Sequence, residues 1–428
     1  MSVSVSKLAN GLRVVTHAMP HMETVSLGVW VGAGARFETL NEHGISHLLE
    51  HMAFKGTQRR SARDIVEEIE SAGGDLNAAT SYETTAYYAR VLKGDVSLAL
   101  DILADILLNP RFDEAELVRE KEVIFQEIAA SQDSPDDVVY DLAQEAAFPD
   151  QAVGRSIMGT AQSVGALTPA DLKKYLKARY TPETMVLGAA GAVDHDTLVD
   201  LAQSTFCVAQ AGSVNKPTPA HYSGGIRQSD KAFEQSHVVL AFKGPSYRDD
   251  EYYTARVFSS LLGGSMSSRL FQEVREKRGL CYSIYSFCWG LTDAGLFGIH
   301  SATGDDQVPE LLDVLNCELE RAAETVPEPA ELARAKAQLK TGLLTSLESP
   351  GMRVEQLAGQ LLAFNRPLEI DELTAKVDAV TGESVRVRAE QLLREGDASF
   401  AIAGSQRSAD ALESLTGKYN NAVVEAAE

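Results

Sequence analysis

An internal repeat constrains the fold of this chain more than any other feature, because a sequence that occurs twice has to form the same kind of unit twice. Helical patterns run through His47 and Ser260, each after an apolar, strand-like run. Similar segments also begin at Ala115 and Ala330. The spacing is 213 residues from 47 to 260 and 215 from 115 to 330. We therefore expect two homologous domains in the same order.

The length and the loop signals agree with that expectation. A chain of 428 residues is too long for one ordinary core. Residues 211–224 contain Pro, Gly and Ser and predict a linker between a first domain of residues 1–210 and a second of residues 225–428. Each half mixes strand-like alternation with helical periodicity. We predict an α+β fold, in which each domain is a mixed or antiparallel sheet with helices packed on one face.

The sequence His47-Leu48-Leu49-Glu50-His51 places two imidazoles on one face of a helix, with about 5–6 Å between their Cβ atoms. That spacing suits two nitrogen ligands of one Zn²⁺. Glu50 lies beside the pair and could take a proton from an activated water. The order H-x-x-E-H is typical of the inverted zincins. The alternative is an amphipathic helix that carries two histidines without a metal.

The repeat separates these readings, because the second copy has different residues at the same positions. His47, Glu50 and His51 align with Ser260, Gly263 and Gly264. Only the first copy can therefore bind a metal at this place, which favours a functional role. Drift after duplication is the alternative explanation.

A catalytic zinc needs a third protein ligand. The helical segment 114–130 offers Glu120 and Glu127, which are seven residues apart and share a face. Glu127 follows an apolar stretch, where an unpaired buried carboxylate is costly, and a metal would remove that cost. The alternative is that these are surface glutamates, which we prefer for Glu116 and Glu122 but not for Glu127.

Together these residues resemble the pitrilysin/insulysin-type inverted-zincin family, and more narrowly its processing-peptidase branch. The resemblance covers nearly the whole chain. Its further motifs lie at residues 10–12, 50–57, 77–81, 154–157 and 266–270. It implies two domains that form half of a clamshell around the substrate.

The resemblance also implies the roles of residues. His47, His51 and Glu127 would bind one zinc ion per chain, and Glu50 would be the general base. Glu120 would orient a ligand histidine.

Two residues of the second half match the family's Arg-x6-Tyr pair. Arg275 and Tyr282 would hold the substrate and the developing oxyanion. Read without the family, they are an arginine at a charged helix end and a tyrosine in the next strand.

The resemblance further implies where a peptide binds. Phe54 would line the subsite just after the cut, and an edge strand would pair with the extended peptide. Asp137 and Asp141 match positions that bind an arginine near the scissile bond, although acidic residues in a first helical turn also complement the helix dipole. The edge-strand residues are Asn77, Ala78, Ala79, Thr80 and Ser81.

The net charge of −22 repels phosphate backbones and favours cationic partners. The resemblance implies a zinc metalloendopeptidase for short, unfolded or presequence-like peptides, with arginine preferred near the cut, and the negative charge agrees with a cationic substrate. We expect no nucleic-acid partner and no membrane insertion, because no apolar run approaches about 18 residues.

Assembly and location are further expectations. Two family domains are half of what the long single-chain relatives use, so we expect a homodimer, with a heterodimer containing an inactive homologue as the alternative. The start at Met1 favours a bacterial cytoplasmic protein, or a mitochondrial matrix protein whose leader has been removed. The rival function is a non-catalytic core or scaffold subunit of the same fold.

Overall fold

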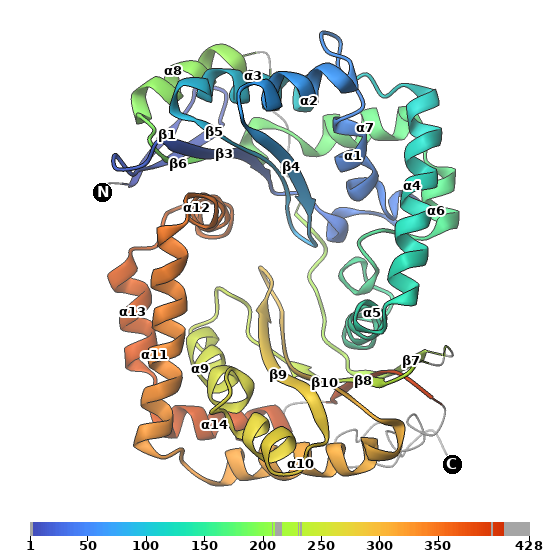
Figure 1. Cartoon of the computed structure of the whole chain (residues 1–428), viewed down its shortest axis with the longest axis vertical. Coiled ribbons are helices and arrows are strands. Elements are labelled where there is room, and N and C mark those ends of the chain that lie inside the picture. Colours follow the sequence, from blue (N-terminus) through green and yellow to red (C-terminus); the bar gives the residue numbers. More distant parts are fainter. Residues whose placement is uncertain are drawn as a thin grey trace. The chain divides into compact units, whose positions relative to one another are not determined.

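The computed structural model describes residues 3–207, 209, 216–229, 231, 233–394 and 397–405 (Figure 1). Part of the predicted linker, residues 211–215, lies outside the described residues. The chain forms two compact units. Unit 1 comprises Met1–Ile128, Ser156–Thr218 and Leu344–Leu368, and unit 2 comprises Ala129–Arg155, Pro219–Leu343 and Glu369–Glu428.

Unit 1 is built on a sheet that has six strands within the described residues. Neighbouring strands are antiparallel except for β2 and β6, which run parallel. The strands, in spatial order, are β1 (Val3–Lys7), β2 (Arg13–Ala18), β6 (Met185–Gly191), β3 (Thr24–Val31), β5 (Thr85–Leu92) and β4 (Asp75–Thr80). β4 is therefore an edge strand.

The central strands β2, β6 and β3 of unit 1 are buried on both faces of the sheet, and their successive side chains point to opposite sides. Val14 packs with the core under most of the helices, whereas its neighbour Val15 packs against α12 (Pro350–Phe364). The helices of the first face are α1 (Ile45–Ala53), α2 (Ala62–Ser71), α3 (Val96–Leu108), α4 (Glu114–Asp133), α6 (Ala161–Ala166), α7 (Pro169–Arg179) and α8 (His195–Thr205).

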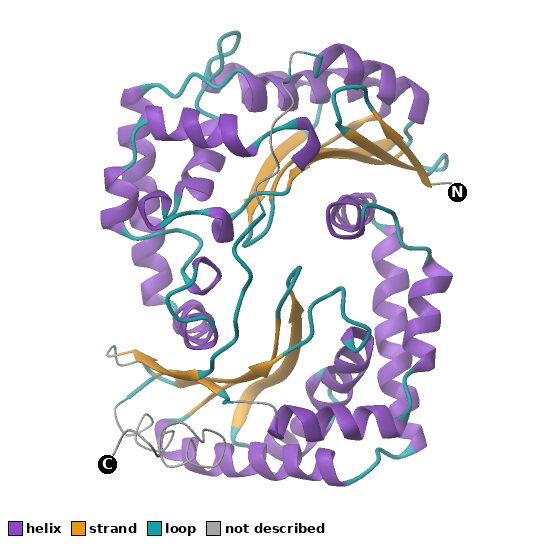
Figure 2. Ribbon diagram, turned by 180° about the vertical axis from the view of Figure 1, so that it is seen from behind, coloured by secondary structure: helices purple, strands orange, loops and turns teal. Residues whose placement is uncertain are grey.

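Unit 2 repeats this plan, and Figure 2 shows its strands with helices packed along them. Its five described strands, in spatial order, are β7 (Gly225–Ser229), β11 (Ser399–Ala403), β8 (Ser236–Lys243), β10 (Gly295–Thr303) and β9 (Cys281–Gly290). Its helices are α5 (Pro135–Ala147), α9 (Tyr252–Gly263), α10 (Val308–Glu324), α11 (Pro329–Thr345), α13 (Ile370–Ala379) and α14 (Gly382–Arg394).

The units differ from the sequence halves 1–210 and 225–428, because each unit contains a helix from the other half. α12 packs on β2, β3 and β6 of unit 1, and α5 packs on β7, β8 and β11 of unit 2 (Figure 1). The two helices are counterparts: α5 begins at Pro135 and α12 at Pro350, each after a serine that caps it, at the repeat spacing of 215. The repeated halves have thus exchanged equivalent helices.

The predicted α+β class and the duplicated plan are confirmed. The exchanged helices α5 and α12 cover the second face of each sheet, which the repeat did not predict. Reciprocal hydrogen bonds between Ser61 and Asp64 fix the N-terminus of α2. Among the described residues, no helix combines the length and the apolar character needed to cross a membrane.

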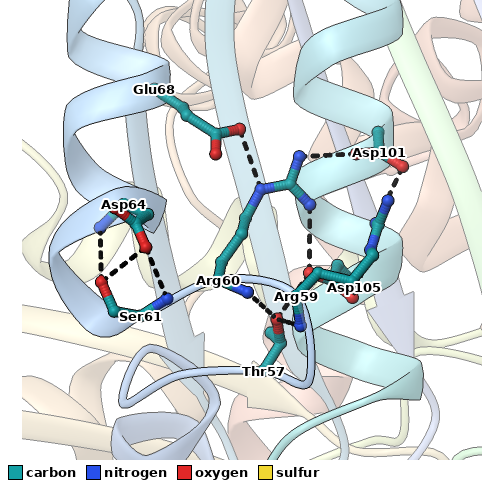
Figure 3. Close-up of polar contacts among 8 residues, drawn as sticks. All are labelled: Thr57, Arg59, Arg60, Ser61, Asp64, Glu68, Asp101 and Asp105. Atoms are coloured by element: carbon teal, nitrogen blue, oxygen red, sulfur yellow. Dashed lines mark hydrogen bonds and ion pairs between the residues drawn. The ribbon is translucent and has the colours of Figure 1, made fainter.

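An ion-pair network fixes the loop that follows α1 (Figure 3). Arg60 donates to Glu68 at 2.8 Å, to Asp101 at 2.6 Å and to Asp105 at 3.0 Å, and so connects the loop to α2 and α3. Thr57 also donates to Asp105, at 2.6 Å. Burial alone would raise the pKa of Asp105, but hydrogen bonds from Thr57 and the arginines outweigh it and lower that pKa below its usual value.

Asp105→Ala should lower the free energy of unfolding by about 3 kcal/mol, the low end for a buried ion pair that loses one member, because Asp101 and Glu68 remain with Arg60. Urea denaturation of both proteins measures this difference. Arg63→Ala is the control, since its pair with Glu67 is exposed and its loss should cost less than about 1 kcal/mol. Equal losses in the two variants would contradict the role of the network.

Candidate metal centre

Helix α1 buries one face and presents the other to α4. Its apolar side chains, Ile45, Leu48, Leu49 and Met52, are essentially without solvent exposure. The helix begins after Gly44, whose φ of 89° favours glycine. Glu38 accepts the backbone N–H groups of Gly44 and Ser46, each at 2.8 Å, and caps the first turn. The buried face thereby orients the polar residues of α1.

Three of the predicted residues come together between α1 and α4. Glu127 Oε2 lies 3.8 Å from His47 Nε2 and 3.5 Å from His51 Nε2. The two imidazole rings are 4.7 Å apart. One ligand atom from each residue lies within 4.8 Å of the others. Two histidines and a carboxylate are a known donor set of catalytic zinc sites.

Glu120 is the buried partner of one histidine. It is only 6% exposed, and its Oε2 lies 3.1 Å from His51 Nδ1. This contact fixes the ring so that Nε2 faces Glu127, as carboxylates do behind zinc-binding histidines. Lys55 Nζ pairs with the other Glu120 oxygen at 2.7 Å. Lys55 was not among the predicted site residues, although it lies four residues after His51.

The electrostatics suit a metal. Burial, followed by the neighbouring His51, lowers the pKa of His47 to about 4, so this imidazole is neutral near pH 7. The neutral ring is the form that binds a metal. His47 Nδ1 is buried and has no hydrogen-bond partner among the described residues, so its ring is not held by a protein acceptor. The residues present therefore fit a zinc ion.

Glu50 is held beside this cluster by the edge strand. Thr80, at the end of β4, donates a hydrogen bond from its hydroxyl to Glu50. Burial raises the pKa of Glu50, and the hydrogen bond from Thr80 opposes that rise. A raised pKa brings a glutamate closer to the neutral range in which a general base works. Thr80 was predicted as part of the peptide-binding edge strand, and its contact with Glu50 was not predicted.

The predicted substrate residues of unit 1 lie on neighbouring elements. Phe54 ends α1 and packs on the core, with its ring 6.4 Å from that of Tyr87. Asn77, Ala78, Ala79 and Thr80 lie in β4, and Ser81 follows that strand. β4 pairs with β5 along one edge, and no strand among the described residues pairs with its other edge.

The other predicted site residues belong to unit 2. Arg275 lies in a π-helical segment, Phe271–Glu276, and its guanidinium carbon is 4.9 Å from the centre of the Tyr282 ring. Tyr282 is 80% exposed near the start of β9. Asp137 and Asp141 lie one turn apart in α5. The structure thus brings together the residues of each pair.

The comparisons with known proteins identify the family. Residues 13–161 match the insulinase family, peptidase family M16, and residues 166–339 match the peptidase M16 inactive domain. An uncharacterized zinc protease of Rickettsia felis is 39% identical over 380 residues, which cover 88% of this chain and 92% of the relative. An uncharacterized zinc protease of Bacillus subtilis is 37% identical, over 92% of this chain and 97% of the relative. The chain belongs to the insulinase (M16) family.

Solved structures confirm the fold. A structure described as a peptidase M16 inactive domain from Pseudomonas fluorescens has a TM-score of 0.87 and 21% identity, covering 95% of this chain and 99% of that one. A protease from Helicobacter pylori has a TM-score of 0.86 and 20% identity, covering 94% and 99%.

Glu120→Gln should weaken zinc binding by about 10- to 100-fold, because the histidine loses its anionic partner while the three ligands remain. Competition with a chromophoric chelator measures the affinity. Glu122→Gln removes an exposed charge from the same helix and should leave the affinity unchanged. A normal affinity for Glu120→Gln would show that Glu120 does not support the metal.

Proposed function

We propose that this protein is a zinc-dependent metalloendopeptidase that cleaves short, unfolded peptides and prefers arginine near the scissile bond. The observation that carries the proposal is the approach of His47, His51 and Glu127 to within 4.8 Å of one another. The zinc proteases among its relatives, which match over most of the chain, support the same reading.

In this proposal each residue of the cluster has one task. His47, His51 and Glu127 would hold one zinc ion. When bound, the ion would act as a Lewis acid and lower the pKa of the attacking water. Glu50 takes a proton from the attacking water and delivers it to the leaving amine. Thr80 keeps the Glu50 carboxylate in place during both transfers.

The peptide would add as an extra strand to the edge of β4 that pairs with no other strand among the described residues. Edge strands offer unpaired N–H and C=O groups, so they recognise an extended backbone with little regard to its side chains. Phe54, at the end of α1, would then supply an apolar wall for the residue after the cut. Because Thr80 contacts Glu50, a peptide on this edge would lie next to the base.

Unit 2 would contribute a positive and a negative group. Arg275, with the phenol of Tyr282 beside it, would hold the substrate and stabilise the oxyanion. Asp137 and Asp141 would bind the arginine of the substrate, in keeping with the net charge of −22. These roles rest on the family resemblance.

The second candidate is a non-catalytic scaffold subunit. A scaffold has no need for a complete set of ligands, a base and a partner for the ligand histidine. All of these are present in unit 1, in contact with one another. We therefore prefer the enzyme.

Glu50→Gln should keep zinc and lower turnover by about 10²- to 10⁴-fold, because the amide retains the shape of the side chain but cannot accept the proton. The measurement is digestion of a mixed peptide pool with the cleavage sites read by mass spectrometry, together with the zinc content of each protein. Glu70→Gln, an exposed glutamate of α2, is the control. Wild-type turnover in Glu50→Gln would remove Glu50 as the base, and a zinc-loaded wild type without cuts would favour the scaffold.

Asp137→Asn combined with Asp141→Asn should reduce the preference for arginine by roughly 10- to 100-fold, the range expected when a hydrogen bond to a charged group is lost. Paired peptides that differ only by arginine or glutamine near the cut measure this ratio. Asp133→Asn, an exposed acidic residue at the end of α4, should not change it. An unchanged ratio in the double variant would show that the subsite lies elsewhere.

A further inference from the structure

A second cluster of two histidines and a carboxylate lies in unit 2, apart from every residue assigned above to catalysis. His237 is in β8 and His300 is in the neighbouring β10. Asp136 is in the first turn of α5, the helix that packs on this sheet. One ligand atom from each residue lies within 4.8 Å of the others.

The sheet register explains why the two histidines meet. His237 pairs with Ala302, and His300 pairs with Val239, so the two histidines are diagonal neighbours on one face. Val238 and Leu240 point to the opposite face, into the core of unit 2. Helix α5 covers the face of the sheet that carries the histidines. His300 is therefore only 3% exposed and His237 only 8% exposed.

The polar groups of this cluster are incompletely satisfied. Asp136 Oδ1 makes a hydrogen bond of 3.0 Å with His237 Nδ1. The same oxygen lies 3.2 Å from His300 Nε2, but the direction is wrong for a hydrogen bond. Both ring nitrogens of the buried His300 therefore have no hydrogen-bond partner among the described residues. A buried polar group in that state needs an explanation.

We propose that Asp136, His237 and His300 bind a second divalent cation of the zinc class. The distances of 3.0 and 3.2 Å from Asp136 Oδ1 to the two ring nitrogens match the separation of about 3.3 Å between ligands around a tetrahedral zinc with bonds of about 2.0–2.1 Å. Imidazole nitrogen with one carboxylate favours zinc and similar transition metals over calcium or magnesium. The cation would lie among His300 Nε2, His237 Nδ1 and Asp136 Oδ1.

The surroundings suit such a site. Tyr140 stacks on His300 with its ring 5.5 Å away, and the Tyr285 ring lies 5.0 Å from it. The hydroxyls of these tyrosines bond to each other at 2.6 Å, which closes an aromatic wall on one side. The Asp136 side chain is 61% exposed, so an ion can enter from solvent. Burial lowers the pKa of His300 to about 4, so its imidazole is neutral and one ring nitrogen has a lone pair that can bind a metal.

The cation would tie the first turn of α5 to the sheet of unit 2. α5 is the helix that comes from the other half of the sequence, so a metal here would fasten the exchanged element at its start. The expected content is then about two zinc ions per chain, one in each unit. This inference does not depend on the proposed peptidase activity.

The test is the zinc content of the full chain after incubation with excess Zn²⁺ and removal of free metal, measured by mass spectrometry of the metal. Wild type should retain about two zinc ions and Asp136→Asn about one. Because Asp136 is exposed, Asn should not disturb the fold. Asp137→Asn removes the adjacent charge and should retain both ions. Glu127→Ala should retain about one, and its combination with Asp136→Asn none.

A second measurement uses the Glu127→Ala background, in which only the cluster of unit 2 remains. Added Zn²⁺ should raise the melting temperature, since a ligand that binds the folded state stabilises it, and Asp136→Asn or His300→Gln should abolish the rise. One zinc ion in wild type, with no change in Asp136→Asn, would overturn the proposal and leave a plain hydrogen-bond network. Two zinc ions in both proteins would also overturn it.

Discussion

The candidate metal centre depends on the burial of one face of a nine-residue helix. α1 has four apolar side chains that are withdrawn from water, and their helical spacing fixes how the helix rolls on the core. Once that face is buried, His47 and His51 point away from the core toward α4, and Glu50 points toward β4. Three polar groups so close together are costly to bury. The neighbouring helix and strand meet that cost with Glu120, Glu127 and Thr80.

A chain of contacts connects the surface to the centre. Lys55 pairs with Glu120, and Glu120 orients His51. The loop after Lys55 is then fastened to α2 and α3 by Arg60. The C-terminal end of α1 is therefore held twice. Glu120 contacts His51, and the ion pairs of Arg60 fix the loop that follows the helix. Such support keeps ligand side chains in place before a metal arrives.

Local spacing in the sequence predicted much of this centre. Helical spacing alone places the two histidines of the H-x-x-E-H pattern on one face, and it places Glu120 and Glu127 on one face of another helix. The only long-range assumption is that these two helices are in contact. The contact of Thr80 with Glu50 and the exchange of α5 and α12 could not be predicted in that way, because both depend on tertiary packing between distant segments. The cluster of Asp136, His237 and His300 was also missed, since strand register brings the two histidines together and the packing of α5 on the sheet adds Asp136.

The exchanged helices have a consequence for the order in which the chain can fold on the ribosome. The sheet of unit 1 is complete once residue 191 has been made, but the helix that covers its second face ends at residue 364. The apolar face formed by Val15, Trp30 and Val186 therefore remains uncovered by α12 while most of unit 2 is synthesised. Domains usually fold as they emerge, N-terminal first. Here each sheet needs a helix from the other half of the sequence to cover its second face, so the two halves have to complete their folding together.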